Sequence, residues 1–187
     1  MNVIFLDFDG VLDTISYNSN EDIENKIKIL SDICKKYDCK VVIEASAKDS
    51  IDEETMETES EWVGFILKMF DKYGIECIGK TPNVVKKSKT GGKLSMWKED
   101  EIIKYLLDHP EIDHFCVIDD DDTLTMLHWP DSDLDKVREH LVTTIMYSEI
   151  PGEEGLLERH SDEVGRILKK ENKYKSLALK RKNNVSK

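Results

Sequence analysis

The chain has 187 residues, of which 39% are hydrophobic and 35% are charged, so it is long enough for one domain with a sizeable core. Its formal net charge of -12 argues against indiscriminate nucleic-acid binding. No apolar run is long enough to span a membrane, and no signal-peptide pattern begins the chain. The four cysteines are scattered, which is typical of reduced thiols, so we expect a cytoplasmic protein with no membrane partner.

Strands alternate with helices along the sequence, as judged from apolar runs and from apolar residues at helical spacing. In chain order we expect a strand at 2–7, a helix at 21–37, a strand at 40–45, a helix at 60–72 capped by Gly74, a strand at 75–78, a helix at 98–108, strands at 114–118 and 141–146, and a helix at 156–170. This order predicts an α/β fold, Rossmann-like, with three α/β/α layers and a mainly parallel sheet. Ligands of such sheets bind beyond the carboxyl ends of the strands.

The first strand runs directly into two carboxylates, in the order Asp7-Phe8-Asp9-Gly10. Residues two apart on a regular strand point to the same side, so Asp7 and Asp9 would share a face. Carboxylates that close repel each other unless a cation lies between them, and Mg²⁺ prefers oxygen ligands. Gly10 allows the chain to turn sharply. The alternative is a strand that ends in a solvated polar turn.

A second strand shows the same switch from apolar to acidic residues about a hundred residues later. The apolar run at 115–118 is followed by four aspartates, at 119–122. Such a block of carboxylates is costly to assemble without a cation. Two acidic strand ends in one α/β chain favour a shared metal site over an acidic loop without a role.

The segment 7–12 resembles motif I of the haloacid dehalogenase (HAD) superfamily, and 119–120 resembles its motif IV in the double-aspartate form. The resemblance implies that Asp7 is a nucleophile that forms an aspartyl-phosphate, and that Asp9 is the general acid and base. It also implies that Asp7, Asp119, Asp120 and the backbone carbonyl of Asp9 hold Mg²⁺. Gly10 would lie beside the phosphate.

Two further HAD motifs have candidates with alternatives. Lys98 fits the charge-neutralising lysine of motif III because it begins the helix before the motif IV strand, and Lys93 is its competitor. Motif II normally supplies a hydroxyl to the phosphate at the end of the second strand. Here Glu44 stands at that place and Ser46 is the nearest hydroxyl. Either Ser46 binds the phosphate or the phosphate site is altered, because an anion at Glu44 would repel the substrate.

The pattern is most similar to a capless HAD branch that includes the HAD domains of RNA-repair proteins. We expect a HAD-like hydrolase core at 1–170 with no large cap, a small lid or loop insert around 47–97, and a basic C-terminal tail at 171–187, frayed at 180–184. The loop at 80–98 is rich in lysine and could attract a phosphorylated polymer, although a solvated loop fits equally well.

These inferences predict a magnesium-dependent phosphatase that hydrolyses a phosphate monoester. Its substrate would be a small molecule, a nucleotide or a nucleic-acid end. One alternative is a nucleic-acid end-processing module, and another is a phosphate-binding or regulatory protein without turnover, which Glu44 would explain. Carbon–halogen cleavage is disfavoured because dehalogenases generally lack an acid at the position of Asp9. The sequence leaves the oligomeric state open.

Overall fold

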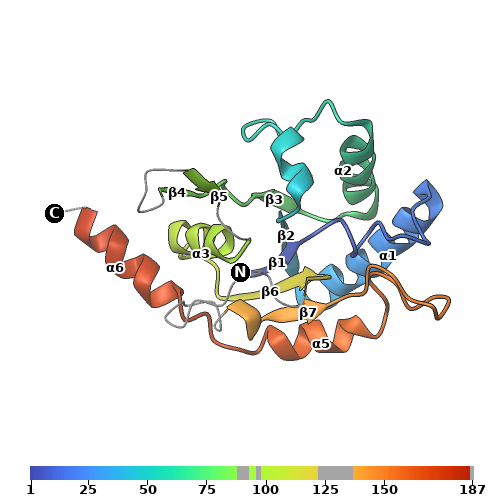
Figure 1. Cartoon of the computed structure of the whole chain (residues 1–187). Coiled ribbons are helices and arrows are strands. Elements are labelled where there is room, and N and C mark those ends of the chain that lie inside the picture. Colours follow the sequence, from blue (N-terminus) through green and yellow to red (C-terminus); the bar gives the residue numbers. More distant parts are fainter. Residues whose placement is uncertain (88–92, 96–97, 122–136, 186–187) are drawn as a thin grey trace.

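A five-stranded parallel sheet forms the centre of the molecule (Figure 1). The structure is a computed structural model, and it describes residues 1–87, 93–95, 98–121 and 137–185. The strand order is β3-β2-β1-β6-β7. The strands are β1 (Asn2–Leu6), β2 (Cys39–Ile43), β3 (Cys77–Lys80), β6 (His114–Asp119) and β7 (Leu141–Thr143).

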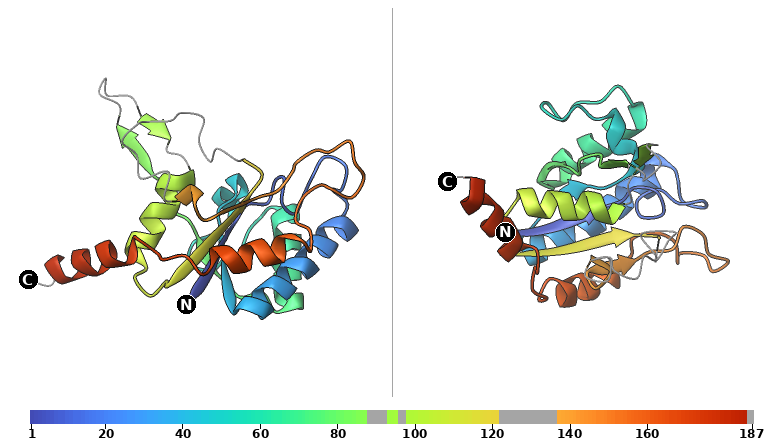
Figure 2. Two further views of the ribbon diagram at one scale, coloured as in Figure 1. Left: turned by 90° about the horizontal axis from the view of Figure 1, so that it is seen from below. Right: turned by 60° about the vertical axis from the view of Figure 1, so that its left-hand side comes forward.

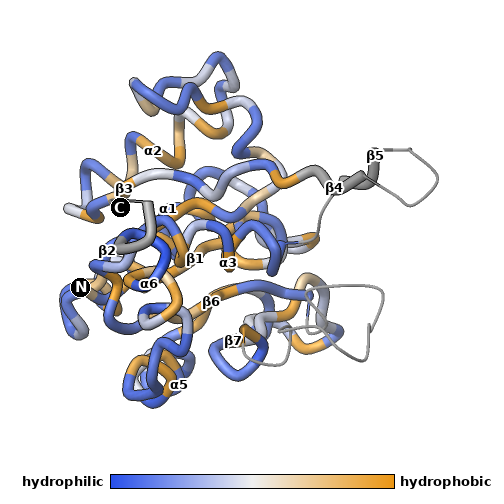
Figure 3. The backbone as a smooth tube through the Cα atoms, turned by 90° about the vertical axis from the view of Figure 1, so that its left-hand side faces the viewer, coloured by the Kyte–Doolittle hydropathy of each residue, from blue (hydrophilic) through white to orange (hydrophobic). Residues whose placement is uncertain are grey.

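Helices cover both faces of this sheet, which confirms the predicted three-layer α/β/α fold (Figure 2). Helices α1 (Asn20–Tyr37), α2 (Glu61–Tyr73) and α5 (His160–Ile167) pack on one face. Helices α3 (Lys98–Asp108) and α6 (Lys175–Val185) lie on the other. Hydrophobic residues run through the central strands, because these strands are buried on both sides (Figure 3).

Local sequence signals explain where the first two helices begin and end. The Ser19 hydroxyl accepts a hydrogen bond from the backbone N–H of Asp22, whose carboxylate accepts one in return, so both ends of this capping box are satisfied at the start of α1. Ser60 caps α2 in the same manner through one bond. Gly74 ends α2 in the left-handed conformation, as predicted from the sequence.

The structure differs from the sequence prediction in the basic segments. Strands β4 (Val85–Lys87) and β5 (Lys93–Ser95) form a separate antiparallel pair where a loop was expected. The segment expected as a basic C-terminal tail contains helix α6, and Tyr174 just before this helix and Ala178 within it are buried. The sequence of α6 lacks the apolar periodicity of an amphipathic helix, so tertiary contacts stabilise it instead.

The stretch predicted as an insert contributes partly to the core. Helix α2 packs against α1, and β3 pairs with β2 at the edge of the main sheet. The short 3₁₀ helix η1 (Ser46–Ser50) follows β2 and leads into this stretch. Among the residues that the structure describes, no helix is both long and apolar enough to cross a membrane.

Candidate active site

The two acidic motifs lie side by side because β1 and β6 are neighbouring strands. Leu6 pairs with Ile118, and the backbone N–H of Asp7 donates to the carbonyl of Ile118 at 3.0 Å. Alternation along both strands then turns Asp7 and Asp119 toward the face that α3 covers. Parallel register alone therefore places the two carboxylates at the same edge of the sheet.

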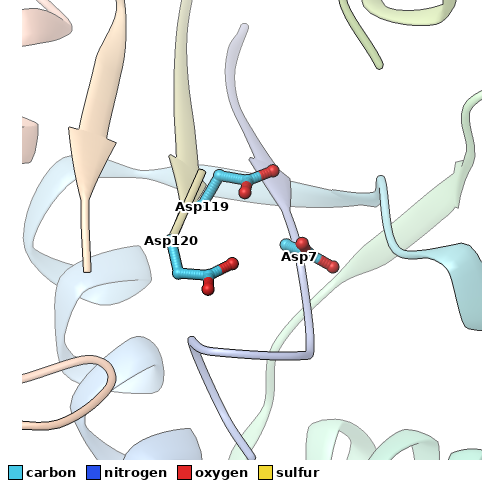
Figure 4. A group of neighbouring side chains, drawn as sticks. All are labelled: Asp7, Asp119 and Asp120. Carbon is cyan, nitrogen blue, oxygen red and sulfur yellow. The ribbon is translucent and has the colours of Figure 1, made fainter. Parts of the chain in front are cut away.

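Three carboxylates converge at this edge. Asp7, Asp119 and Asp120 each offer an oxygen, and these oxygens lie within 4.8 Å of one another. Figure 4 shows the three side chains gathered between the ends of β1 and β6. An all-oxygen, multiply charged donor set is the kind that Mg²⁺ prefers, so the residues fit the expected metal.

Lys98 is the first residue of α3, and it bridges two of these carboxylates. Its ammonium group forms an ion pair with Asp7 and another with Asp119, the latter at 2.7 Å. Burial opposes the charge on Lys98, but the two carboxylates outweigh burial and raise its pKa. Lys98 is therefore a fixed positive charge, and it compensates only one of the three negative charges around it.

The surroundings of Asp7 disfavour its ionised form when no metal is bound. Burial raises its pKa to about 7, with a further contribution from repulsion by Asp119, while Lys98 acts in the opposite direction. The N–H of Phe8 donates to Asp7 Oδ1 at 2.7 Å and fixes that oxygen. A divalent cation at this position would favour the ionised, nucleophilic form.

Gly10 is required where the loop after β1 packs against Asp120. It has a φ of +71°, and a Cβ built there would lie 2.3 Å from Cγ of Asp120. The carbonyl of Gly10 accepts a hydrogen bond at 2.7 Å from the buried hydroxyl of Thr144, whose own N–H donates to the carbonyl of Asp119. Thr144 thus connects the loops that follow β1 and β6.

Asp9 lies apart from the group of three carboxylates. Strand β1 ends at Leu6, so the regular alternation that would put Asp7 and Asp9 on one face does not continue. Asp9 is exposed, and its Oδ2 accepts a hydrogen bond of 3.4 Å from the hydroxyl of Ser46. Its side chain is therefore open to solvent beside the three carboxylates.

Comparison with known families identifies the relationship of the chain. Residues 3–148 match the family described as the HAD domain in Swiss Army Knife RNA repair proteins. The chain belongs to this HAD family. This confirms the resemblance seen in the sequence, and it implies a phosphohydrolase-type activity. A comparison with curated proteins found no match, and neither did a comparison with solved structures.

Glu44, the residue expected at the HAD motif II position, is buried beside a positively charged neighbour. Glu44 is only 1% exposed, and its Oε2 accepts hydrogen bonds from Thr81 Oγ1 at 2.8 Å and from Lys48 Nζ at 3.1 Å. Lys48 also forms a buried ion pair with Glu101. The charge of Glu44 is thus partly balanced before any phosphate arrives, which reduces the repulsion expected from the sequence.

Sequence reasoning missed several residues of this HAD site. Thr144 follows β7 directly, but the strand was predicted to continue to 146, so Thr144 did not stand at a predicted strand end. Lys48, Thr81 and Glu101 come from three separate segments, and nothing in their spacing showed that they would meet at Glu44. The alternative motif III residue, Lys93, lies in β5, and its side chain is outside the described part of the structure.

Proposed function

We propose that this HAD protein is a magnesium-dependent phosphatase that hydrolyses phosphate monoesters through an aspartyl-phosphate, with an RNA end as its substrate. The observation that supports this most directly is the arrangement of Asp7, Asp119 and Lys98. Two carboxylates from adjacent strand ends share one ammonium group, and one of them is fixed by the N–H of Phe8. This arrangement suits a nucleophile whose product carries additional negative charge.

In the first half-reaction, an oxygen of Asp7 attacks phosphorus and the bond to the leaving oxygen breaks. Asp9 supplies the proton that the leaving alcohol requires. Lys98 offsets the charge that develops on the phosphoryl oxygens. Mg²⁺, held by Asp7, Asp119, Asp120 and the carbonyl of Asp9, would supply further positive charge against those oxygens when bound.

In the second half-reaction, water attacks the phosphorus of the aspartyl-phosphate. Asp9 takes the proton from that water, and the bond between phosphorus and Asp7 breaks. Phosphate leaves, and both aspartates return to their starting states. Ser46 is placed to orient Asp9 through its hydroxyl, and it also lies at the rim where a phosphate oxygen would sit.

The proposal of an RNA end as the substrate rests on the family, whose description places its HAD domain in RNA repair proteins. The exposure of Asp9 is consistent with a large substrate, because the leaving group must approach from the open side of the site. The acidic surface does not favour long stretches of polyanion, so recognition would be limited to the terminus.

The test measures hydrolysis of p-nitrophenyl phosphate and of a 3′-phosphorylated oligoribonucleotide, with Mg²⁺ and with a chelator. We expect Mg²⁺-dependent release of phosphate from both, and a loss of about 10³-fold or more in Asp7→Asn. Asp32→Asn, an exposed aspartate on α1, is the matched control. Lys98→Met should lose about 10²- to 10³-fold, whereas Lys104→Met on the exposed side of α3 should not.

Acid-quenched samples analysed by mass spectrometry test the intermediate. We expect a phosphoryl group on the peptide that contains Asp7 and none on that peptide in Asp7→Asn. Full activity in Asp7→Asn would refute the assignment of the nucleophile. Binding of Mg²⁺ and phosphate without any hydrolysis would favour the alternative of a non-catalytic, phosphate-binding protein.

A further inference from the structure

A cavity lined mostly by polar and charged residues opens beside the proposed phosphate site. Its volume is about 300 Å³, near the lower end of the range for small-molecule sites. Two residues of the proposed active site, Ser46 and Lys98, line it. A group attached to a phosphate at Asp7 could therefore enter this cavity without leaving the active site.

A residue that lines the cavity has a carboxylate oxygen without a partner among the residues that the structure describes. Glu44 lines the cavity, and its Oε1 is buried and accepts no hydrogen bond from any residue that the structure describes. Its other oxygen is already bound by Thr81 and Lys48. A buried acceptor without a donor is destabilising, and such groups in native proteins call for an explanation.

Neighbouring residues hold this carboxylate in a fixed position. Lys48 donates to Glu44 and to Thr81, and it pairs with Glu101 as well. Glu101 in turn accepts from the N–H of Val84 at 3.3 Å. These contacts join the end of β2 to the segment after β3 and to α3. They hold the side chain of Glu44 in place, which is what a preorganised binding group requires.

The chemistry of the cavity restricts the group that it accepts. The carboxylates of Glu44 and Glu101 disfavour a second phosphate group in the cavity. A cationic ligand group is also disfavoured, because Lys48 already forms ion pairs with both carboxylates. Burial raises the pKa of Glu44 to about 8, so both its acid and its carboxylate forms are relevant near neutral pH. A hydroxyl can donate to one form and accept from the other, so it complements Glu44 in either state.

We infer that this cavity receives the sugar next to the scissile phosphate, and that Glu44 Oε1 binds its neighbouring hydroxyl. For a 3′-phosphorylated RNA end, that hydroxyl is the 2′-OH, the group by which a protein can distinguish RNA from DNA. This inference rests on the proposed function for the position of the phosphate. It adds a selectivity for ribose over deoxyribose, which arises from a residue outside the reacting groups.

The experiment compares adenosine 3′-monophosphate with its 2′-deoxy analogue. Dissociation constants are measured by calorimetry with Mg²⁺ in Asp7→Asn, and kcat/KM is measured in the wild-type protein. We expect the ribonucleotide to be favoured by about 10- to 100-fold, the range for a hydrogen bond to a charged group. Glu44→Met, combined with Asp7→Asn for binding, should reduce this ratio to about one. The exposed Glu54→Met is the matched control and should keep the ratio.

Each result supports or overturns the inference. Equal affinity for the two nucleotides would overturn it, and would indicate that water satisfies Glu44. A preference that persists in Glu44→Met, with the fold verified by circular dichroism and thermal melting, would also overturn it. If Glu44→Met does not fold, the ratio in the wild-type protein and in Glu44→Gln decides, because the amide retains a hydrogen-bonding group and should keep part of the preference.

The two proposals fail separately. If the protein hydrolyses p-nitrophenyl phosphate but binds both nucleotides equally, the phosphatase proposal survives and the sugar site does not. If it hydrolyses neither p-nitrophenyl phosphate nor a nucleotide, yet binds the ribonucleotide more tightly, the sugar site survives without catalysis.

Discussion

Gly10→Ala should weaken Mg²⁺ binding while the protein stays folded. The added Cβ would lie 2.3 Å from Cγ and 2.5 Å from Oδ2 of Asp120, so this carboxylate must move away. A left-handed alanine costs about 1–2 kcal/mol of stability, which lowers Tm by roughly 2–8 °C in a chain of this size. Displacing Asp120 should weaken Mg²⁺ binding by about 10- to 100-fold, as when other supports of metal ligands are lost.

Gly74→Ala separates backbone strain from the clash. Gly74 has the same φ of +71°, but a Cβ there would meet nothing within 4 Å. Gly10→Ala, which adds a clash to the same backbone strain, should lose at least as much stability as Gly74→Ala in thermal melts, and only Gly10→Ala should require more Mg²⁺ in calorimetric titrations. Equal Mg²⁺ affinity in wild-type and Gly10→Ala proteins would refute the reasoning, as would an equal loss of affinity in Gly74→Ala.

Two further predictions concern buried residues that support the fold. Thr144→Val leaves the carbonyl of Gly10 without its buried hydroxyl donor, so urea unfolding should show a loss of about 1–3 kcal/mol, whereas the exposed Thr143→Val should change stability little. Burial lowers the pKa of His160 to about 4, and its Nδ1 accepts from the N–H of Leu157. The unfolded chain therefore binds this proton more readily, and stability should fall as pH drops from about 6.5 to about 4. His160→Asn should flatten that part of the curve, and an unchanged curve would contradict the assignment.

The sheet and its acidic edge could be predicted from sequence because short-range patterns encode them. Apolar runs that switch to aspartate marked the ends of β1 and β6, and parallel pairing then required Asp7 and Asp119 to meet. Lys98 could be placed for a similar reason, because helical periodicity located the start of α3. The family match over residues 3–148 agrees with this interpretation.

The environment of Glu44 could not be predicted, because it depends on contacts between distant segments. Lys48 and Thr81 lie 33 residues apart, and Lys48 and Glu101 lie 53 apart, yet the three side chains meet at one buried point. Helix α6 was missed for a related reason, since its sequence shows no apolar periodicity, while Tyr174 just before it and Ala178 within it are buried. The roles of individual site residues stay predictions until the variants are measured.

The backbone ladder between β1 and β6 has a consequence for how such a protein can diversify. Neighbouring strands lie about 4.8 Å apart whatever their side chains are, so the separation of the reacting groups is inherited from main-chain pairing. The residues after β2, from Glu44 to Lys48, lie outside that ladder and contact the neighbouring cavity. Exchanging Glu44 or Lys48, while Ser46 stays beside Asp9, would redirect the protein toward another leaving group and leave the reaction centre intact.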